Sequence, residues 1–408
     1  MIHLNYKESP DNARTVSLPI SKSIMNRELI LRASSTALFP SISSTYPDDV
    51  NILIRALTSR IKRIDIGAAG TAMRFSTAYF ATGDEEKSIH GSARMHERPI
   101  KELVDALKSL GADINYLGIE GYPPILIKPV TSMGGSVAIS GSTSSQYISA
   151  LLLSGHRMKK GLRLALTPPI SSRPYIDMTL AVMKENGIRF EIEGNTVSIA
   201  HQKVESPKLI KEEKDWSAAA FFYGLVSLGK PDKLLLEGLH LNSVQGDRFL
   251  ADLYEPLGVS TEETLGGILI KKVKKSEGEF SAQLQNTPDL AQAMAFTCAA
   301  LGIQCHLTGL HSLRIKETDR IAAIAECLSQ CGIEVDQGSD YLSFSGRLDQ
   351  GSEPVFKSYH DHRMAMSCSI LASCFESICI RNPEVVNKSF PNFWNEMNAI
   401  GYQSRIAT

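Results

Sequence analysis

The sequence lacks the features of a membrane, secreted or general nucleic-acid-binding protein. Its best apolar run, Ala218–Leu228, is about half of the ~20 residues that a membrane span needs. The first residues, Met1–Asn12, hold no apolar segment like that of a signal peptide. Lys and Arg number 43 against 44 Asp and Glu, whereas a general nucleic-acid binder carries a clear basic excess. We therefore expect neither a membrane nor a nucleic acid as a partner.

An even, paired set of cysteines is also missing. The seven cysteines fall in the second half of the chain and lie within apolar runs: Cys298, Cys305, Cys327, Cys331, Cys368, Cys374 and Cys379. This odd, buried pattern favours free thiols over disulfides, and hence a reducing, cytoplasmic setting.

Signatures of a metal or cofactor site are incomplete. Cys327 and Cys331 could share one helix face, but no second Cys or His pair completes a zinc set. His360-Asp361-His362 alternates without a third ligand. The glycine-rich segment Gly67–Thr71 fits neither a P-loop nor a dinucleotide fingerprint. We expect no metal and no cofactor.

A repeated pattern is present instead: an apolar helical run, then a glycine, then a short apolar strand. The glycines Gly111, Gly187, Gly258, Gly332 and Gly401 lie 69 to 76 residues apart, and each suits the left-handed residue that ends a helix. The helices predicted before them are Leu103–Leu110, Met178–Asn186, Phe249–Leu257, Ile321–Cys331 and Phe393–Ile400. A weaker sixth copy, Ile52–Ile61, has no glycine. Six similar αβ modules are indicated, in a chain long enough for two domains.

A second kind of predicted helix, with a polar head and a small, apolar body, lies between these copies. The bodies are Ile24–Ala33, Ala72–Phe80, Tyr147–Ser154, Ala218–Leu228, Leu290–Leu301 and Met364–Cys374. Because they are apolar on most sides, we expect them to be buried inside a domain. The predicted fold class is α/β.

Cations gather near the heads of these helices. Lys316-Glu317-Thr318-Asp319-Arg320 directly precedes an apolar helical run, which places two cations at a helix N-terminus. Each would oppose the helix dipole by roughly 0.3–1 kcal/mol unless an anion shares the site. Free helix N–H groups and Arg side chains together suit phosphate and carboxylate ligands. Simple solvation of each cation is the alternative reading. The other cations near heads or in Gly/Pro-flanked loops are Lys22, Arg27, Arg74, Arg94, Arg98, Arg173, Arg363 and Lys388.

These segments resemble the motifs of the 5-enolpyruvylshikimate-3-phosphate synthase family, in the family's order and over nearly the whole chain. The matching segments are Ser21–Ser23 with Arg27, Gly70–Arg74, Arg94–Pro99, Ser144–Gln146, Ser172–Tyr175, Pro288-Asp289, Lys316–Arg320, Asp361–Met366 and Lys388–Pro391. The Lys316–Arg320 and His362-Arg363 segments are the most specific of them.

The resemblance implies two similar domains, each made of three βαβαββ units with buried helices, an inside-out α/β barrel. Residues 1–19 with 214–408 would form one domain, and residues 20–213 the other. The ligands would lie in the cleft between the domains.

The resemblance also implies transfer of the enolpyruvyl group of phosphoenolpyruvate to the 5-hydroxyl of shikimate 3-phosphate, with release of phosphate. Asp289 would take the hydroxyl proton, Glu317 would protonate the methylene carbon, and Lys22 would assist. Shikimate 3-phosphate would be held by Lys22, Ser23, Arg27, Ser144, Ser145, Gln146, Ser172, Tyr175, Asp289, Ser312 and Lys316. Phosphoenolpyruvate would be held by Lys22, Gly70, Arg94, Gln146, Arg320, Arg363 and Lys388. We expect a cytoplasmic monomer.

Three positions depart from the family pattern: Ala68 replaces a common Asn, Phe75 a common Pro, and Ser312 a common Asn. The related UDP-N-acetylglucosamine enolpyruvyl transferases carry a Cys where this chain has Ala93, and usually an Asn where it has Ser23. A non-catalytic ligand-binding homologue is a further alternative, against which the intact Asp289, Glu317 and Lys22 argue.

Overall fold

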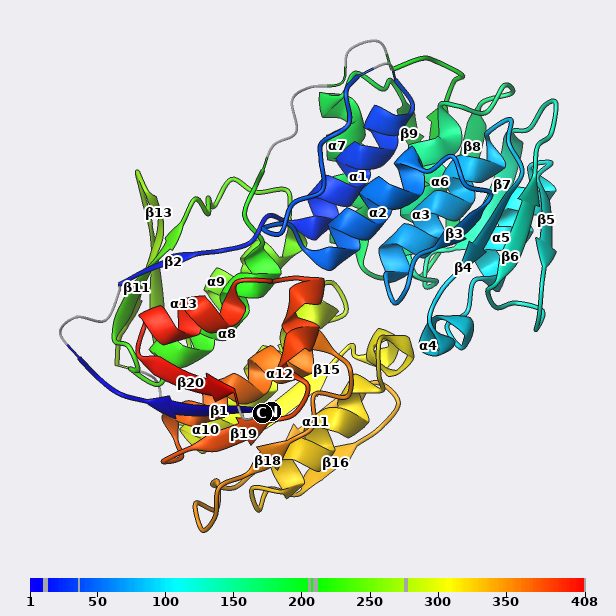
Figure 1. Ribbon diagram of the computed structural model, residues 1–408. Coiled ribbons are helices and arrows are strands. Elements are labelled where there is room, and N and C mark those ends of the chain that lie inside the picture. The colour runs from blue at the N-terminus through cyan, green and yellow to red at the C-terminus, as the bar shows by residue number, and fades with distance from the viewer. Residues whose placement is uncertain (10–13, 36, 205–206, 208–211, 275–277, 407–408) are drawn as a thin grey trace. The chain divides into compact units, whose positions relative to one another are not determined.

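The computed structural model describes the 408-residue chain except residues 10–13, 36, 205–206, 208–211, 275–277 and 407–408 (Figure 1). The chain divides into two compact units. Unit 1 comprises residues 1–21 and 213–408, and unit 2 comprises residues 22–212.

Unit 2 contains two four-stranded sheets among its described residues, with the strand orders β3-β4-β6-β5 and β7-β8-β10-β9. The strands are β3 (Arg63–Asp65), β4 (Lys87–His90), β5 (Asp113–Tyr116), β6 (Ile125–Lys128), β7 (Gly135–Ser140), β8 (Leu162–Thr167), β9 (Glu191–Glu193) and β10 (Thr196–Ile199). The helices are α1 (Lys22–Ala33), α2 (Asp48–Thr58), α3 (Gly70–Ala81), α4 (Ala93–His96), α5 (Lys101–Ser109), α6 (Ser145–Gly155) and α7 (Arg173–Glu185).

The described residues of unit 1 form three four-stranded sheets, with the orders β12-β13-β11-β2, β14-β15-β17-β16 and β18-β19-β1-β20. The strands are β1 (Ile2–Tyr6), β2 (Thr15–Ser17), β11 (Lys233–Glu237), β12 (Val259–Thr264), β13 (Gly267–Lys272), β14 (Glu279–Gln283), β15 (Gln304–Thr308), β16 (Val335–Gln337), β17 (Tyr341–Phe344), β18 (Val355–Phe356), β19 (Ile378–Ile380) and β20 (Tyr402–Ile406). The α-helices are α8 (Trp216–Ser227), α9 (Leu250–Tyr254), α10 (Ala291–Leu301), α11 (Arg320–Ser329), α12 (His362–Cys368) and α13 (Phe393–Ala399). Short 3₁₀ segments are η1 (Gly246–Phe249), η2 (Pro288–Leu290), η3 (His311–Ile315), η4 (Ser369–Ser373) and η5 (Pro383–Lys388).

The five four-stranded sheets formed by the described residues share one topology. Six modules were predicted; the weakest copy, Ile52–Ile61, corresponds to α2, and no sixth four-stranded sheet is formed by the described residues. The first two strands of each module are parallel, and the remaining pairings are antiparallel, as in β14-β15-β17-β16. With the intervening helices this gives the order βαβαββ, which confirms the predicted module. In the sheet that closes unit 1, β1 takes the place of the module's fourth strand and lies between β19 and β20, with which it pairs. The two ends of the chain therefore lie side by side (Figure 1).

Helices are buried inside each unit, as their composition predicted. In α6 every residue from Tyr147 to Gly155 is buried, and in α10 every residue from Ala291 to Ala299. A helix that is apolar on all sides is stable only when other elements surround it. By contrast α5 and α11 bury one face, because charged residues alternate with their apolar positions. The predicted α/β fold of two similar units with internal helices is confirmed.

The helix ends largely follow the glycine pattern, with two corrections. Gly111, Gly187, Gly258, Gly332 and Gly401 all have positive φ, between 79° and 105°. The predicted single helix Met364–Cys374 is wrong, because α12 gives way to η4 at Ser369, where the Ser369 hydroxyl donates to the Met366 carbonyl at 2.6 Å. The predicted Phe249–Leu257 is shorter, with α9 ending at Tyr254.

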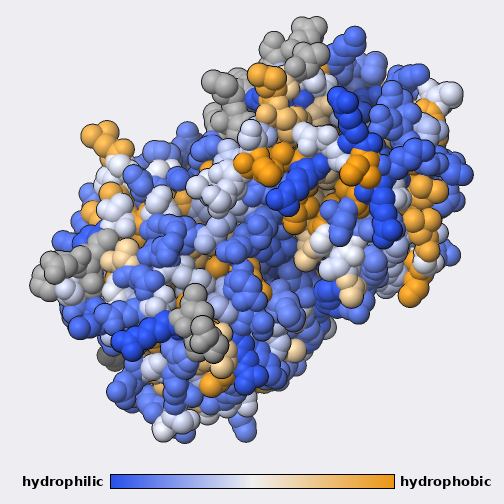
Figure 2. All heavy atoms as spheres, viewed as in Figure 1, coloured by the Kyte–Doolittle hydropathy of each residue, from blue (hydrophilic) through white to orange (hydrophobic). Residues whose placement is uncertain are grey.

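Hydrophilic residues cover most of the face seen in Figure 2, and hydrophobic residues form small groups on it. Exposed apolar side chains include Leu38, Ile61, Ile119 and Leu265. No helix in the described part of the chain is both long and apolar enough to cross a bilayer.

Candidate active site

Arg320 is the centre of a charged cluster in unit 1. It is the first residue of α11, and only 2% of its side chain is exposed. Its guanidinium donates to three carboxylates: Nε to Asp361 at 2.7 Å, Nη1 to Asp289 at 2.9 Å, and Nη2 to Glu317 at 3.2 Å. Burial alone would lower the pKa of Arg320, but the three carboxylates outweigh burial and raise it. Arg320 is therefore a permanent cation that orients three acids.

Arg363 connects the same acids from α12. Its Nη2 donates to Asp289 Oδ2 at 3.0 Å, and its Nη1 to the Asp289 carbonyl at 3.1 Å. Asp361 caps α12 by accepting the Arg363 backbone N–H at 2.9 Å. Burial lowers the pKa of Arg363, yet Asp289 and other acids raise it overall. Asp289 thus lies between two buried guanidinium groups.

Two lysines complete the cluster. The Lys316 Nζ lies 3.7 Å from Asp289 Oδ1, and the Lys388 Nζ lies 3.6 Å from Glu317 Oε1. Of the residues predicted for this unit, six are joined in this way, and Ser312 lies on η3, four residues before Lys316.

The structure corrects two expectations about the Lys316–Arg320 segment. Lys316 is not part of the helix head, because it is extended (φ −79°, ψ −154°) and α11 begins only at Arg320, after the cap Asp319. A bound ligand is also not the only source of negative charge near these cations. Resident carboxylates from η2, α12 and the segment itself supply the negative charge that the helix N-terminus favours.

A further acid, Asp247, lies close to this cluster and was not among the predicted residues. It is 4% exposed, on η1, and its Oδ2 accepts a hydrogen bond from the Ser217 hydroxyl. Burial, followed by the negative charge of Asp289, raises the pKa of Asp247 to about 7.

In unit 2, Lys22 begins α1 and pairs with Asp49 from α2. Its Nζ donates to Asp49 Oδ2 at 3.0 Å, and both side chains are largely buried. A cation at a helix start is thus again matched by a resident carboxylate.

Arg27 is a buried cation that bonds only neutral groups among the described residues. Its Nε donates to Thr179 at 2.8 Å, its Nη1 to the Ser23 carbonyl at 2.6 Å, and its Nη2 to Ser149 and the Tyr175 carbonyl, both at 3.1 Å. Burial lowers the pKa of Arg27 to about 10. Since it stays charged at neutral pH, Arg27 makes this end of unit 2 electropositive and ties α1 to α6 and α7.

The head of α6 carries three predicted residues. Ser144 caps the helix by accepting the Gln146 N–H, Ser145 is its first residue, and the Gln146 amide donates to Thr71 of α3 at 3.3 Å. The heads of α3 and α6 are therefore adjacent.

Ser172 stands at the N-cap of α7 in the left-handed region, with φ 53°. Backbone strain of this kind in a residue other than glycine costs of order 1–3 kcal/mol and is concentrated at functional sites. Tyr175 follows in the first turn, and its carbonyl is one of the Arg27 acceptors.

Gly70 begins α3 directly against Arg98. A Cβ built on Gly70 would lie 2.7 Å from Arg98 Nη2, so only glycine fits while Arg98 keeps its place. Arg94 on α4 is 43% exposed and pairs with Glu97 at 3.0 Å, which leaves it the most accessible of these predicted cations.

Sequence reasoning predicted Asp289 and Glu317 as functional acids but missed the other acids that partner or neighbour the cations, Asp49, Asp361 and Asp247. Asp49 follows Pro47-Asp48 at a helix start, where an acid is an ordinary first-turn residue. In the sequence, Asp361 belonged to the segment His360-Asp361-His362, which is incomplete as a metal site, and to the family motif Asp361–Met366, but neither identified it as a counter-charge. Asp247 had no sequence signal of function except the preceding Gly246. Arg98 was noted only as a loop cation.

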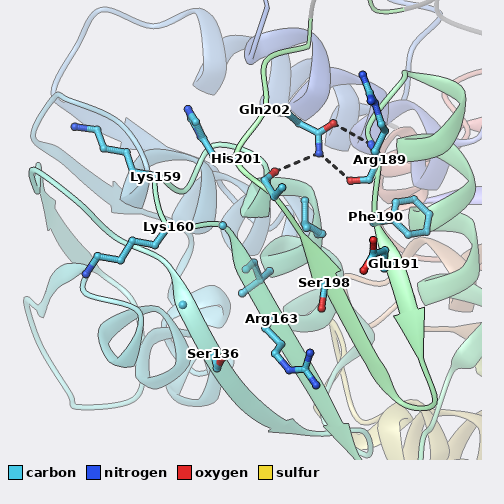
Figure 3. A pocket seen from close by; sticks show the side chains of 15 residues that line it. Ser136, Lys159, Lys160, Arg163, Arg189, Phe190, Glu191, Ser198, His201 and Gln202 are labelled. Carbon is cyan, nitrogen blue, oxygen red and sulfur yellow. Dashed lines mark hydrogen bonds between the residues drawn. The ribbon is translucent and has the colours of Figure 1, made fainter.

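A described hollow in unit 2 lies away from these residues. It holds about 910 Å³ and lies over β7, β8 and β10, and no predicted site residue is among the described residues that line it. Figure 3 shows Lys159, Lys160, Arg163 and Arg189 pointing in different directions, not at one common point. The Gln202 side chain accepts the Arg189 backbone N–H and donates to the Arg189 and Ala200 carbonyls, which indicates a structural role for this wall.

The described residues contain no group of three or more His, Cys, Asp or Glu side chains arranged to hold a metal ion. The seven cysteines, all within the described residues, are thiols that form no disulfide, and six of them are buried. The prediction of free thiols is confirmed.

Comparison with known proteins gives concordant results for sequence and structure. A sequence model of the family described as EPSP synthase (3-phosphoshikimate 1-carboxyvinyltransferase) matches residues 50–397. The 3-phosphoshikimate 1-carboxyvinyltransferase of Bacteroides fragilis is 41% identical over 96% of this chain and 96% of its own length. The protein of that name from Haemophilus influenzae is 32% identical over 95% and 96% of the two chains.

Solved structures share the fold. An EPSP synthase from Acinetobacter baumannii superimposes with a TM-score of 0.78 at 21% identity and covers 100% of both chains. The enolpyruvyl transferase NikO from Streptomyces tendae gives a TM-score of 0.72 at 14% identity, over 99% of this chain and 98% of its own. At these identities the structural likeness concerns the fold alone.

Proposed function

Because the chain belongs to the EPSP synthase family, we propose that it transfers the enolpyruvyl group of phosphoenolpyruvate to the 5-hydroxyl of shikimate 3-phosphate by means of Asp289, Glu317 and Lys22. The family and the reaction predicted from the motifs are confirmed by the relatives, which are enzymes named for this activity. The assignment of individual residues is our proposal. The observation that carries it is the arrangement of two acids, Asp289 and Glu317, on one shared cation, Arg320.

The resident ion pairs explain how substrate binding would activate both acids. Glu317 lies between Arg320 and Lys388, which favour its ionised form. When the phosphate and carboxylate of phosphoenolpyruvate take over those cations, Glu317 loses two positive partners and gains negative neighbours. Both changes favour the protonated acid that can deliver a proton to the methylene carbon.

The proton affinity of Asp289 would rise for the same reason. Arg320, Arg363 and Lys316 stabilise its carboxylate in the free protein, which weakens it as a base. Once these cations engage the substrates, Asp289 becomes a better acceptor for the proton of the 5-hydroxyl. The hydroxyl oxygen then bonds to C2 of phosphoenolpyruvate while Glu317 protonates C3. Glu317, now a carboxylate, next takes a proton from C3 as the C2–O bond to phosphate breaks, which releases phosphate and restores the enolpyruvyl double bond.

The cations supply the rest of the proposed catalysis by positioning and by electrostatic stabilisation. In unit 2 we assign Lys22, Gly70, Arg94 and Gln146 to phosphoenolpyruvate. To shikimate 3-phosphate we assign Lys22, Ser23, Arg27, Ser144, Ser145, Gln146, Ser172 and Tyr175. In unit 1 we assign Arg320, Arg363 and Lys388 to phosphoenolpyruvate, and Asp289, Ser312 and Lys316 to shikimate 3-phosphate. Action of both sets on one bound pair of substrates stays a prediction, as do a monomeric state and a cytoplasmic location.

Phosphate release from the two substrates tests the proposal. Glu317→Gln keeps the shape of the side chain but removes the ionisable proton, so we expect kcat to fall about 10²–10⁴-fold, the usual contribution of a general acid. Glu326→Gln is the matched control and should leave kcat unchanged. Glu326 lies on α11, is half-exposed and pairs with Lys357.

Two results would contradict the proposal. Full activity of Glu317→Gln would remove Glu317 from the mechanism. Binding of both ligands by the natural protein without phosphate release would identify a non-catalytic homologue. Replacement of shikimate 3-phosphate by UDP-N-acetylglucosamine should give no phosphate, since Ala93 occupies the cysteine position of the enzymes that use that acceptor.

A further inference from the structure

Asp247 is the acid near the charged cluster for which the proposed mechanism has no use. It lies on η1, which packs against α8, and η2 with Asp289 packs against the same helix. Its Oδ2 accepts the Ser217 hydroxyl bond, while its Oδ1 is buried without a hydrogen-bond partner among the described residues. An ionised carboxylate with a single neutral donor is a costly group to bury. The geometry alone therefore favours a protonated Asp247.

The charged groups that face Asp247 come from three neighbouring elements. Asp289 on η2 and Asp215 at the cap of α8 disfavour its ionised form, whereas Arg363 on α12 and the Ser217 hydroxyl favour it. The Asp215 carboxylate is itself engaged by the backbone N–H groups of Ser217 and Ala218. Asp289 and Asp247 are thus neighbouring carboxyls in opposite environments, one held by three cations and the other by one hydroxyl.

The net charge of the cluster depends on this proton. The groups joined by ion pairs are four cations and three carboxylates: Arg320, Arg363, Lys316, Lys388, Asp289, Glu317 and Asp361. Four positive and three negative charges leave these seven groups with one net positive charge. Ionisation of Asp247 beside Arg363 would cancel that charge.

We propose that Asp247 is a positioning residue whose protonated form leaves Arg363 with its full positive charge for the anionic substrate. This inference rests on the proposed function only in naming that substrate as phosphoenolpyruvate. An ionised Asp247 competes for Arg363, so the loss of its proton weakens binding of the anion. By linkage, binding of the anion strengthens the hold of Asp247 on its proton. Because burial raises the pKa of Asp247 to about 7, this balance shifts near neutral pH.

The test is the KM for phosphoenolpyruvate, measured from pH 6 to pH 8.5 at saturating shikimate 3-phosphate. In the natural protein we expect KM to rise about five- to tenfold over this range, at the low end of typical coupling between sites. Asp247→Asn keeps the shape and the Ser217 acceptor but cannot ionise, so its KM should stay at the low-pH value apart from the titration of the substrate itself. Asp252→Asn, an exposed acid on α9, is the matched control and should follow the natural protein.

A purely structural role would lower the activity of Asp247→Asn equally at every pH. A KM in Asp247→Asn that rises with pH as steeply as in the natural protein would overturn the inference. A second readout depends on neither turnover nor the variant. Infrared difference spectra of the natural protein should show a protonated carboxyl band that disappears as the pH rises through about 7. Absence of that band at pH 6 would overturn the inference even if the protein proved inactive.

Discussion

Replacement of Asp361 by Asn should destabilise unit 1 far more than the loss of an ordinary ion pair. Asp361 is fully buried and accepts from Arg320 at 2.7 Å and 3.4 Å. The Asn side chain retains an oxygen that can cap α12, so the main change is the loss of one buried negative charge. Removing one partner of a buried ion pair costs about 3–5 kcal/mol, because the other charge is left uncompensated. Asp289 and Glu317 still compensate part of the Arg320 charge, which places our estimate near the lower limit, at about 3 kcal/mol.

Urea unfolding followed by tryptophan fluorescence measures this loss in unit 1 specifically. The two tryptophans of the chain, Trp216 and Trp394, both belong to that unit. With a urea dependence of about 2 kcal/mol per molar, the midpoint should fall by about 1.5 M. The control is Asp319→Asn, which also leaves a capping oxygen but removes a half-exposed pair with Arg314 at 2.6 Å. It should cost less than about 1 kcal/mol. Equal midpoints for the two variants would refute the argument that Arg320 needs Asp361 as a buried counter-charge.

Two further predictions concern unit 2. Burial lowers the pKa of His156 to about 4, so as the pH falls below about 6.5 the unfolded chain binds a proton that the folded chain does not. The free energy of unfolding should therefore fall by about 3 kcal/mol by pH 4. In unfolding followed by circular dichroism, His156→Gln should lack this part of the pH dependence. An unchanged pH dependence in that variant would contradict the assignment to His156. Gly70→Ala should weaken phosphoenolpyruvate binding more than it changes the unfolding free energy, since its Cβ would displace the Arg98 guanidinium, the far end of a flexible side chain, while alanine favours the helix. Gly118→Ala, where the nearest atom lies 3.8 Å from the new Cβ, is the control, and a similar loss of binding there would contradict the steric explanation.

Local sequence signals predicted the fold well because they act over a few residues. Glycine at the end of α5 or α11 adopts the positive φ that other residues avoid, so its position marks a helix end without knowledge of the tertiary structure. The apolar bodies of α6 and α10 predicted burial for the same reason. The break between α12 and η4 was missed, because Ser369 is as compatible with a helix as with the tighter turn that it stabilises.

The site was only half predictable. Its cations stood out because they occupy positions that oppose a helix dipole, which is a local anomaly. The partners that were missed are acids far along the chain: Asp49 lies 27 residues from Lys22, and Asp361 lies 41 residues from Arg320. Nothing near Asp49 or Asp361 in the sequence distinguishes a buried counter-charge from an ordinary solvated acid. Only the packing of α2 on α1 and of α12 on α11 determines which carboxylate meets which cation.

The strand β1 has a consequence for biosynthesis. Ribosomes make Ile2–Tyr6 more than 370 residues before its partners in β19 and β20. All of unit 2 emerges in between, so it can fold while unit 1 still waits for its closing strands. Throughout that interval the apolar Ile2 and Leu4, which end fully buried, have no sheet to join. A growing chain of this kind would benefit from a chaperone at its N-terminus, and a pause late in translation would prolong the exposure.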